Sequence, residues 1–148
     1  MEHFPVPRIV VVGAKAHGKS SLLENITKCP VFPRRGDDPC TAGPCTRCPV
    51  RVLMYPSDRG EESATVTHGG TTISISDWTS NPERVREEVA RLAPPEGFSS
   101  EEVVVELRGP DLVRLELVDL PSFHSSLRRV NGPAEAAAGL VRSFLRIC

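Results

Sequence analysis

The sequence predicts an α/β protein in which a mostly parallel sheet is flanked by helices, and three observations lead to this fold class. First, the run of β-branched residues at 9–12 has the composition of a buried strand. Second, a loop with two glycines follows this strand, and residues 21–27 then place Leu22, Leu23 and Ile26 on one face of a helix. Third, strand-like and helical segments alternate along the rest of the chain.

The loop between this strand and helix carries the strongest motif in the chain. Residues 13–20, GAKAHGKS, match the pattern G-x-x-x-x-G-K-[ST] of a phosphate-binding loop. Gly13 and Gly18 let the backbone curl so that successive N–H groups point at one phosphate, and the helix adds the positive end of its dipole. Lys19 supplies charge to the terminal phosphates, and the Ser20 hydroxyl is placed to coordinate Mg²⁺. The plain alternative is a glycine turn between a strand and a helix.

The composition narrows the class of protein. The chain has 148 residues, which suits one domain, and its net charge of −1 and 39% hydrophobic content point neither to nucleic acid nor to a disordered tail. The longest apolar run is too short to span a membrane, and the chain does not open on a basic, apolar leader. We therefore expect a soluble, cytoplasmic protein with no nucleic-acid partner.

The cysteines leave a minor alternative open. Their number is five, and without a secretion signal a disulfide framework is not expected. Cys40, Cys45 and Cys48 have the spacing C-x4-C-x2-C that some iron–sulfur proteins use, with Cys29 or His68 as an imaginable fourth ligand. Because tetrahedral sites usually show two clear ligand pairs, reduced thiols are the preferred interpretation.

The remaining segments follow from their periodicity and turn residues. A long loop, 30–49, comes after the first helix, and its position behind a phosphate loop favours a functional switch segment. Ser80 or Asn81 is expected to cap a helix with Pro82 in its first turn. A polar loop at 122–132 precedes a final helix that Pro133 opens. Strands are predicted at 50–54, 64–67, 71–76, 102–107 and 112–119, the second and third forming a hairpin around residues 68–70.

Several of these pieces together resemble the dynamin superfamily of large GTPases. They are GKSS followed by LLENI at 18–26, T-R-x-P at 46–49, and V-D-L-P at 118–121, and the similarity runs from about Pro7 to the last helix. The resemblance implies the phosphate-loop NTPase fold of a Ras-like, dynamin-type G domain. Within residues 1–148 it places the phosphate loop at 13–20, switch I at 30–49 and switch II at 119–132.

The resemblance also implies roles for single residues. Lys19 and Thr46 would take part in catalysis, with Thr46 positioning the attacking water. Lys15, where the family has Gln, could add a positive charge near the phosphates and so take part in catalysis, with a solvated surface lysine as the equal alternative. Ser20, Thr46 and Asp119 would hold Mg²⁺. His124 could orient a water, although a structural or exposed role is the simpler interpretation. The nucleotide-binding residues would be Gly13, Ala14, Lys15, Ala16, His17, Gly18, Lys19, Ser20, Ser21, Asp119 and Ser122.

Three departures from the family pattern are visible. Lys15 and Ala16 stand where the family usually has Gln and Ser, and the chain contains no Gln. Ser122 stands where Gly is expected, which removes freedom at positive φ. The base-reading motif [NT]-K-x-D does not occur, so the chain looks like the N-terminal half of a G domain, and the preference for guanine is inferred from the family alone.

The sequence therefore predicts binding of a guanine nucleotide and hydrolysis of GTP with Mg²⁺, as part of a dynamin-like GTPase. One alternative is a truncated, catalytically inactive fragment that binds nucleotide weakly or serves as an interaction module. An unrelated phosphate-loop kinase is a further alternative, but no lid or acceptor site can be identified for it. We also expect self-association or pairing with a downstream half, and membrane or cytoskeletal association only through regions outside this sequence.

Overall fold

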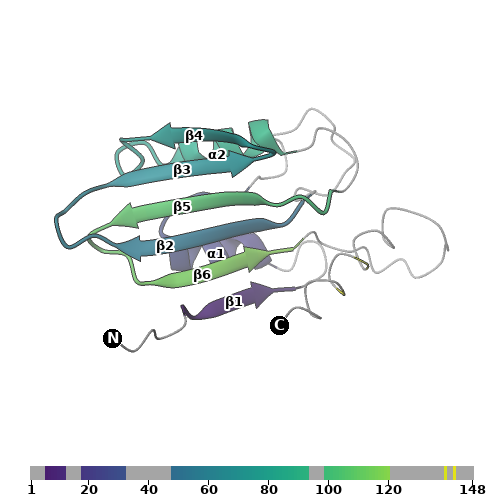
Figure 1. Cartoon of the computed structure of the whole chain (residues 1–148). Coiled ribbons are helices and arrows are strands. Elements are labelled where there is room, and N and C mark those ends of the chain that lie inside the picture. The colour runs from purple at the N-terminus through teal and green to yellow at the C-terminus, as the bar shows by residue number, and fades with distance from the viewer. Residues whose placement is uncertain are drawn as a thin grey trace.

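The computed structural model describes residues 6–12, 18–32, 48–93 and 99–120, together with residues 139 and 142. The described residues up to 120 form one six-stranded sheet and two helices (Figure 1). In chain order they are β1 (Arg8–Val11), α1 (Lys19–Thr27), β2 (Val50–Pro56), β3 (Ser63–His68), β4 (Thr71–Ile75), α2 (Glu83–Leu92), β5 (Val103–Gly109) and β6 (Leu115–Asp119).

The sheet has the strand order β1-β6-β2-β5-β3-β4. β1 runs parallel to β6, and β2 runs parallel to β5. The other three pairings, β2 with β6, β3 with β5 and β3 with β4, are antiparallel. The α/β class is thus confirmed, and the described part of the sheet is mixed. Only residues 110–114 connect β5 to β6, and so short a connection reverses the chain, because parallel strands need a longer crossover.

The predicted hairpin is confirmed as β3 and β4. Its two-residue loop is Gly69-Gly70, with φ angles of 56° and 80°. Positive φ at both central positions is the requirement of a type I′ turn, whose twist matches that of the flanking strands. Thr67 and Thr72 face each other across the hairpin, with their hydroxyl oxygens 3.0 Å apart.

The core lies between one face of the sheet and the two helices. Alternate residues of β2 and β5 are buried, and Leu23 of α1 joins the same apolar cluster as Val85 and Val89 of α2. Both helices therefore pack on the same face, behind the sheet in Figure 1. The sheet residues of this core are Val50, Val52, Met54, Ala64, Val66, Ile75, Val103, Val105, Leu107 and Leu117.

The predicted strand boundaries differ from the structure by up to three residues, with the largest difference at the start of β6, and the predicted cap of α2 also differs. β6 begins at Leu115 instead of residue 112, and Val113 is 62% exposed in the connection that follows β5. The N-cap of α2 is Pro82, without a side-chain hydrogen bond, and neither Ser80 nor Asn81 caps it. Their N–H groups instead donate to the Asp77 carbonyl, at 3.1 and 3.0 Å, in a turn before the helix.

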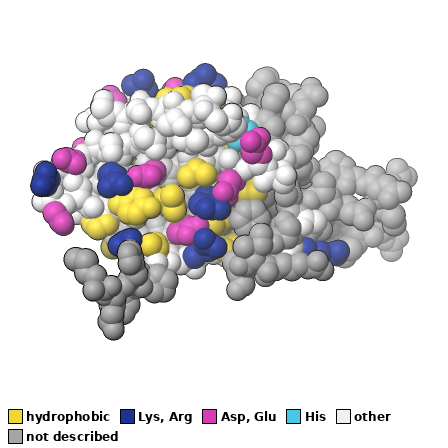
Figure 2. All heavy atoms as spheres, viewed as in Figure 1, with side chains coloured by type: hydrophobic (Ala, Val, Ile, Leu, Met, Phe, Trp, Pro, Cys, Tyr) yellow, Lys and Arg dark blue, Asp and Glu magenta, His cyan; other side chains and the backbone are white. Residues whose placement is uncertain are grey.

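Of the predicted final helix, only residues 139 and 142 are described, and both are helical. None of the helices in the described ranges combines the length and apolarity needed to cross a membrane. The face of the sheet opposite α1 and α2 is turned to the viewer in Figure 2. Apolar side chains there are interspersed with acidic and basic ones.

Candidate nucleotide-binding site

The start of α1 has the backbone geometry that the phosphate-loop motif requires. Gly18 is the N-cap residue, with φ 73° and ψ 14° in the left-handed region, where a side chain would be strained. The Leu22 N–H donates to the Gly18 carbonyl at 3.0 Å and closes the first helical turn. The following residues, Lys19, Ser20 and Ser21, therefore occupy the helix N-terminus, where backbone N–H groups and the helix dipole favour an anion.

The sheet brings a second predicted site residue to the same edge. β1 and β6 are parallel and in register, so that Val11, at the end of β1, is paired with Asp119, at the end of β6. The carboxyl ends of neighbouring parallel strands are the edge at which open α/β sheets bind ligands. α1 follows β1 in the chain and contacts β6 (Figure 1). Lys19, the first residue of α1, contacts Asp119, and this contact places the N-terminus of the helix beside the end of β6.

Lys19 and Asp119 form a buried ion pair at this edge. The Lys19 Nζ contacts Oδ1 of Asp119 and donates a second hydrogen bond of 2.7 Å to the carbonyl of Leu120. The two side chains are 7% and 0% exposed, respectively. Because burying one charge alone is costly, each side chain compensates the other in this arrangement.

The residues at this edge fit a phosphate together with a divalent cation. Lys19 supplies positive charge, and the helix N-terminus supplies N–H donors. The Ser20 hydroxyl and the Asp119 carboxylate are oxygen ligands of the kind that Mg²⁺ prefers, and they would hold the ion. The arrangement thus combines the groups needed to bind a polyphosphate and to neutralise its charge.

The structure brings together five of the predicted site residues, Gly18, Lys19, Ser20, Ser21 and Asp119. Gly13, Ala14, Lys15, Ala16, His17, Thr46, Ser122 and His124 lie outside the described residues, and so do most of both predicted switches. Sequence analysis missed the carbonyl of Leu120 as an acceptor for the lysine. The V-D-L-P motif places Leu120 next to Asp119, but a backbone acceptor leaves no signal in the residue type.

The cysteines in the described ranges are structural. Cys29 and Cys48 are free and buried in the core, and burial raises their pKa values to about 12 and about 11. His68, considered as a metal ligand, has Nδ1 3.1 Å from the carbonyl oxygen of Glu102. No group of three or more His, Cys, Asp or Glu side chains in the described residues is arranged to hold a metal ion, while Cys40 and Cys45 fall outside those ranges.

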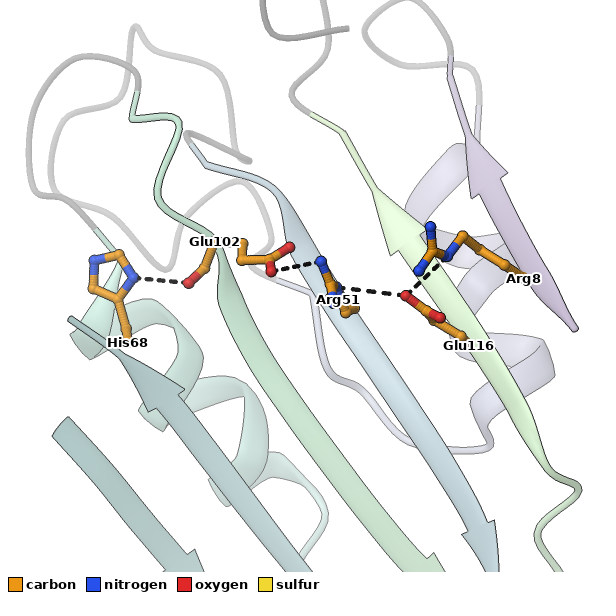
Figure 3. Close-up of polar contacts among 5 residues, drawn as sticks. All are labelled: Arg8, Arg51, His68, Glu102 and Glu116. Carbon is orange, nitrogen blue, oxygen red and sulfur yellow. Dashed lines mark hydrogen bonds and ion pairs between the residues drawn. The ribbon is translucent and has the colours of Figure 1, made fainter. Parts of the chain in front are cut away.

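A row of charged side chains crosses the sheet on the face opposite the helices (Figure 3). Arg8 Nε lies 3.0 Å from Oε1 of Glu116, and Arg51 Nε lies 3.5 Å from the same oxygen. Nη2 of Arg51 lies 2.6 Å from Oε1 of Glu102. Glu116 is buried in this row. This row links β1, β6, β2 and the residue before β5.

A phosphate-loop strand and helix, with a lysine and an aspartate meeting at the carboxyl edge of an α/β sheet, define a phosphate-loop NTPase. The sequence matches the Dynamin family over residues 9–137, which is most of the chain, and the protein belongs to that family.

Individual relatives agree with this assignment. The chain is 32% identical over 120 residues to "Interferon-induced GTP-binding protein Mx" of Dicentrarchus labrax, a match that covers 80% of the chain and 17% of the relative. It is 32% identical over 127 residues to "Dynamin-like GTPase OPA1, mitochondrial" of Gallus gallus, a match that covers 82% of the chain and 12% of the relative. It is 32% identical over 124 residues to "Dynamin-A" of Dictyostelium discoideum, a match that covers 80% of the chain and 14% of the relative. The chain thus spans less than a fifth of the length of these three relatives.

Proposed function

We propose that this chain binds GTP with Mg²⁺ and hydrolyses it to GDP and phosphate, as part of a dynamin-like GTPase. The observation that carries the proposal is the meeting of Lys19 and Asp119 at the N-terminus of α1. Family membership supports guanine as the base, because the relatives described above include a GTP-binding protein and a GTPase by name.

The described residues suit the charge distribution of phosphoryl transfer. Catalysis of this reaction is mostly positioning and neutralisation of the phosphate oxygens. Lys19 and the N–H groups at the start of α1 would hold the terminal phosphates, and Ser20 and Asp119 would hold the cation. Mg²⁺, when bound, would neutralise charge that develops on the phosphates. By family resemblance, Thr46 would position the attacking water.

Removal of the lysine charge tests this proposal. Lys19→Ala should lower the affinity for a fluorescent GTP analogue with Mg²⁺ by about a hundredfold, because a hydrogen bond from a charged group to phosphate contributes about 1.5–3 kcal/mol. Lys28→Asn is the matched control. It removes an exposed lysine charge at the end of the same helix, and asparagine tolerates the φ of 57° at that position. Unchanged affinity in Lys19→Ala would overturn the phosphate-loop assignment.

A binding module without turnover is the second candidate, and the phosphate-loop sequence favours it. Lys15 and Ala16 occupy the positions where the family usually has Gln and Ser. A protein that lacks these side chains can bind nucleotide through Lys19 and hydrolyse it slowly or not at all. Measurement of phosphate release at saturating GTP separates the two candidates, since only the enzyme releases phosphate.

A further inference from the structure

We propose that Glu116 is a positioning residue for the nucleotide-binding site and acts through arginines on the two neighbouring strands. This role rests on the proposed binding of GTP, and it belongs to a residue that touches neither phosphate nor cation in that proposal. The carboxylate would hold β1 and β2 against β6, so that three chain segments of the predicted site meet at one edge of the sheet.

Three strands carry these segments, and they lie side by side in the order β1-β6-β2. The phosphate loop at 13–20 follows β1, Asp119 ends β6, and the predicted switch I at 30–49 leads directly into β2. The register pairs Asp119 with Val11, the last residue of β1, and with Val50, the first residue of β2. Movement of either outer strand relative to β6 would therefore separate segments that a bound nucleotide needs together.

Glu116 precedes Asp119 on β6 and is linked to the strands on both sides (Figure 3). Its N–H donates to the carbonyl of Pro7 at 2.9 Å, and its Oε1 lies 3.0 Å from Nε of Arg8, the first residue of β1. On the other side, the same oxygen lies 3.5 Å from Nε of Arg51, the second residue of β2. One residue of β6 thus connects the beginnings of both neighbouring strands.

The backbone ladder alone gives β1 a limited attachment. β1 has four residues and, among the described strands, pairs only with β6. Segments with few buried contacts open locally at a low cost in free energy. The carboxylate of Glu116 adds an ion pair to this attachment, and because its side chain is only 9% exposed, the pair is screened less than a surface pair. Glu116 should therefore raise the fraction of molecules in which β1 is aligned with β6.

Loss of the charge should loosen both neighbouring strands at once. Glu116→Gln keeps the size of the side chain but leaves the guanidinium groups of Arg8 and Arg51 without the carboxylate between them. Repulsion between these like charges favours conformations in which the strands on the two sides of β6 move apart. A ligand that binds only the aligned conformation loses apparent affinity in proportion to the population of that conformation. Glu116→Gln should therefore weaken nucleotide binding.

Titration of a fluorescent GTP analogue with Mg²⁺ into the whole chain tests this role. We expect the affinity of Glu116→Gln to be about fivefold or more below that of the wild type, within the usual range of coupling between sites. Val66→Ala is the control for stability, because it truncates a buried residue of β3, which β2 and β5 separate from β6. It should destabilise the fold and bind the analogue as the wild type does. A thermal melt of each variant checks that it is folded at the temperature of the titration.

A double-mutant cycle shows whether Glu116 acts through an arginine. Arg51→Met removes one of the two arginines while keeping a long side chain, and it should also weaken binding of the analogue. In Arg51→Met/Glu116→Gln the loss of affinity should be smaller than the product of the two single losses, because both changes break the same ion pair. The single variant Arg51→Met decides the question if Glu116→Gln does not fold.

The outcomes distinguish the positioning role from the proposed function. Wild-type affinity in Glu116→Gln, or in Arg51→Met where Glu116→Gln does not fold, would overturn the positioning role and leave nucleotide binding intact. An equal loss of affinity in Val66→Ala would show that only stability matters. Single losses that multiply in the double variant would show that the two residues act independently, which also contradicts the proposal. A wild type that does not bind the analogue would overturn the proposed function, and the positioning role with it.

Discussion

Arg8 Nε lies 3.0 Å from Oε1 of Glu116, and this ion pair joins the edge strand β1 to β6. The same oxygen of Glu116 lies 3.5 Å from Nε of Arg51, on the strand at the other side of β6. Glu116 is therefore the carboxylate between two arginines, and its side chain is only 9% exposed. It connects three neighbouring strands on the face of the sheet that α1 and α2 leave open.

Removal of the Glu116 charge should destabilise the fold. Glu116→Gln leaves Arg8 and Arg51 close together without their shared carboxylate, and we expect a loss of about 1–3 kcal/mol in the free energy of unfolding. Urea denaturation of the wild type and the variant measures this loss. Glu106→Gln is the control, because Glu106 forms an ion pair with the half-exposed Arg108. Loss of this surface pair should lower the free energy of unfolding by at most about 1 kcal/mol. Equal effects of the two substitutions would contradict the bridging role of Glu116.

Turnover should respond to the two unusual phosphate-loop residues. We expect slow hydrolysis of GTP with Lys15 and Ala16 in place, and a rate at least about tenfold higher in the double variant Lys15→Gln/Ala16→Ser, equivalent to about 1.4 kcal/mol in the barrier. Phosphate release at saturating GTP and Mg²⁺ measures both rates. Fast hydrolysis of GTP by the native sequence would show that the reaction does not need the Gln and Ser side chains that are usual in the family.

The buried thiols should be unreactive and should make stability depend on alkaline pH. Burial, assisted for Cys29 by the nearby Glu24 and Glu83, raises its pKa from 9.0 to about 12, and burial raises the pKa of Cys48 to about 11. At pH 8 the Cys29 thiol is therefore almost entirely protonated in the native protein, and alkylation should be slow until urea unfolds the chain. Mass spectrometry of peptides after alkylation measures each cysteine separately.

The sign of the pH effect follows from the same shifts. The folded state holds the thiol protons more tightly than the unfolded state, so the stabilising contribution is complete below pH 9 and is lost as pH rises toward 11 and 12. Urea melts at pH 8 and pH 10.5 should show lower stability at the higher pH. Cys29→Ser is not a suitable variant for measuring this pH dependence, because it would bury a hydroxyl group in an apolar core. Cys29→Ala is the suitable variant and should reduce the pH dependence.

Local patterns predicted the parts of the fold that depend on neighbouring residues. The left-handed Gly18 before α1 and the Gly69-Gly70 turn follow from glycine chemistry, and the structure confirms both elements. Family resemblance placed Lys19 and Asp119 in one nucleotide site but did not predict their direct contact, since residues so far apart in the chain leave no local signal of it.

The remaining features depend on pairings between distant strands. The position of β6 between β1 and β2 makes the sheet mixed, and no periodicity within a strand specifies which neighbour it will have. The residue type of Glu116 indicates a solvent-facing position, because acidic side chains are rarely buried without partners. Its burial depends on Arg8 and Arg51, which only the strand order brings to it.

The final prediction concerns β1, which lies at the edge of the sheet and pairs only with β6 among the described strands. Ile9, within β1, is 42% exposed, and Val12, which follows the last residue of β1, is 41% exposed. An apolar edge strand offers unpaired N–H and C=O groups to another chain, so we expect the isolated chain to self-associate.

A lysine in this strand should reduce the association, because a charge on an edge strand opposes pairing with a second chain. Light scattering combined with a thermal melt should show large species for the wild type and smaller ones for Ile9→Lys. Val113→Lys is the matched control, since it makes the same kind of change at a residue that is 62% exposed and lies outside the sheet. A wild-type chain that is monodisperse and melts cooperatively as a monomer would show that the edge of β1 is covered in solution. Equal effects of the two lysines would mean that added charge, and not the edge strand, controls the association.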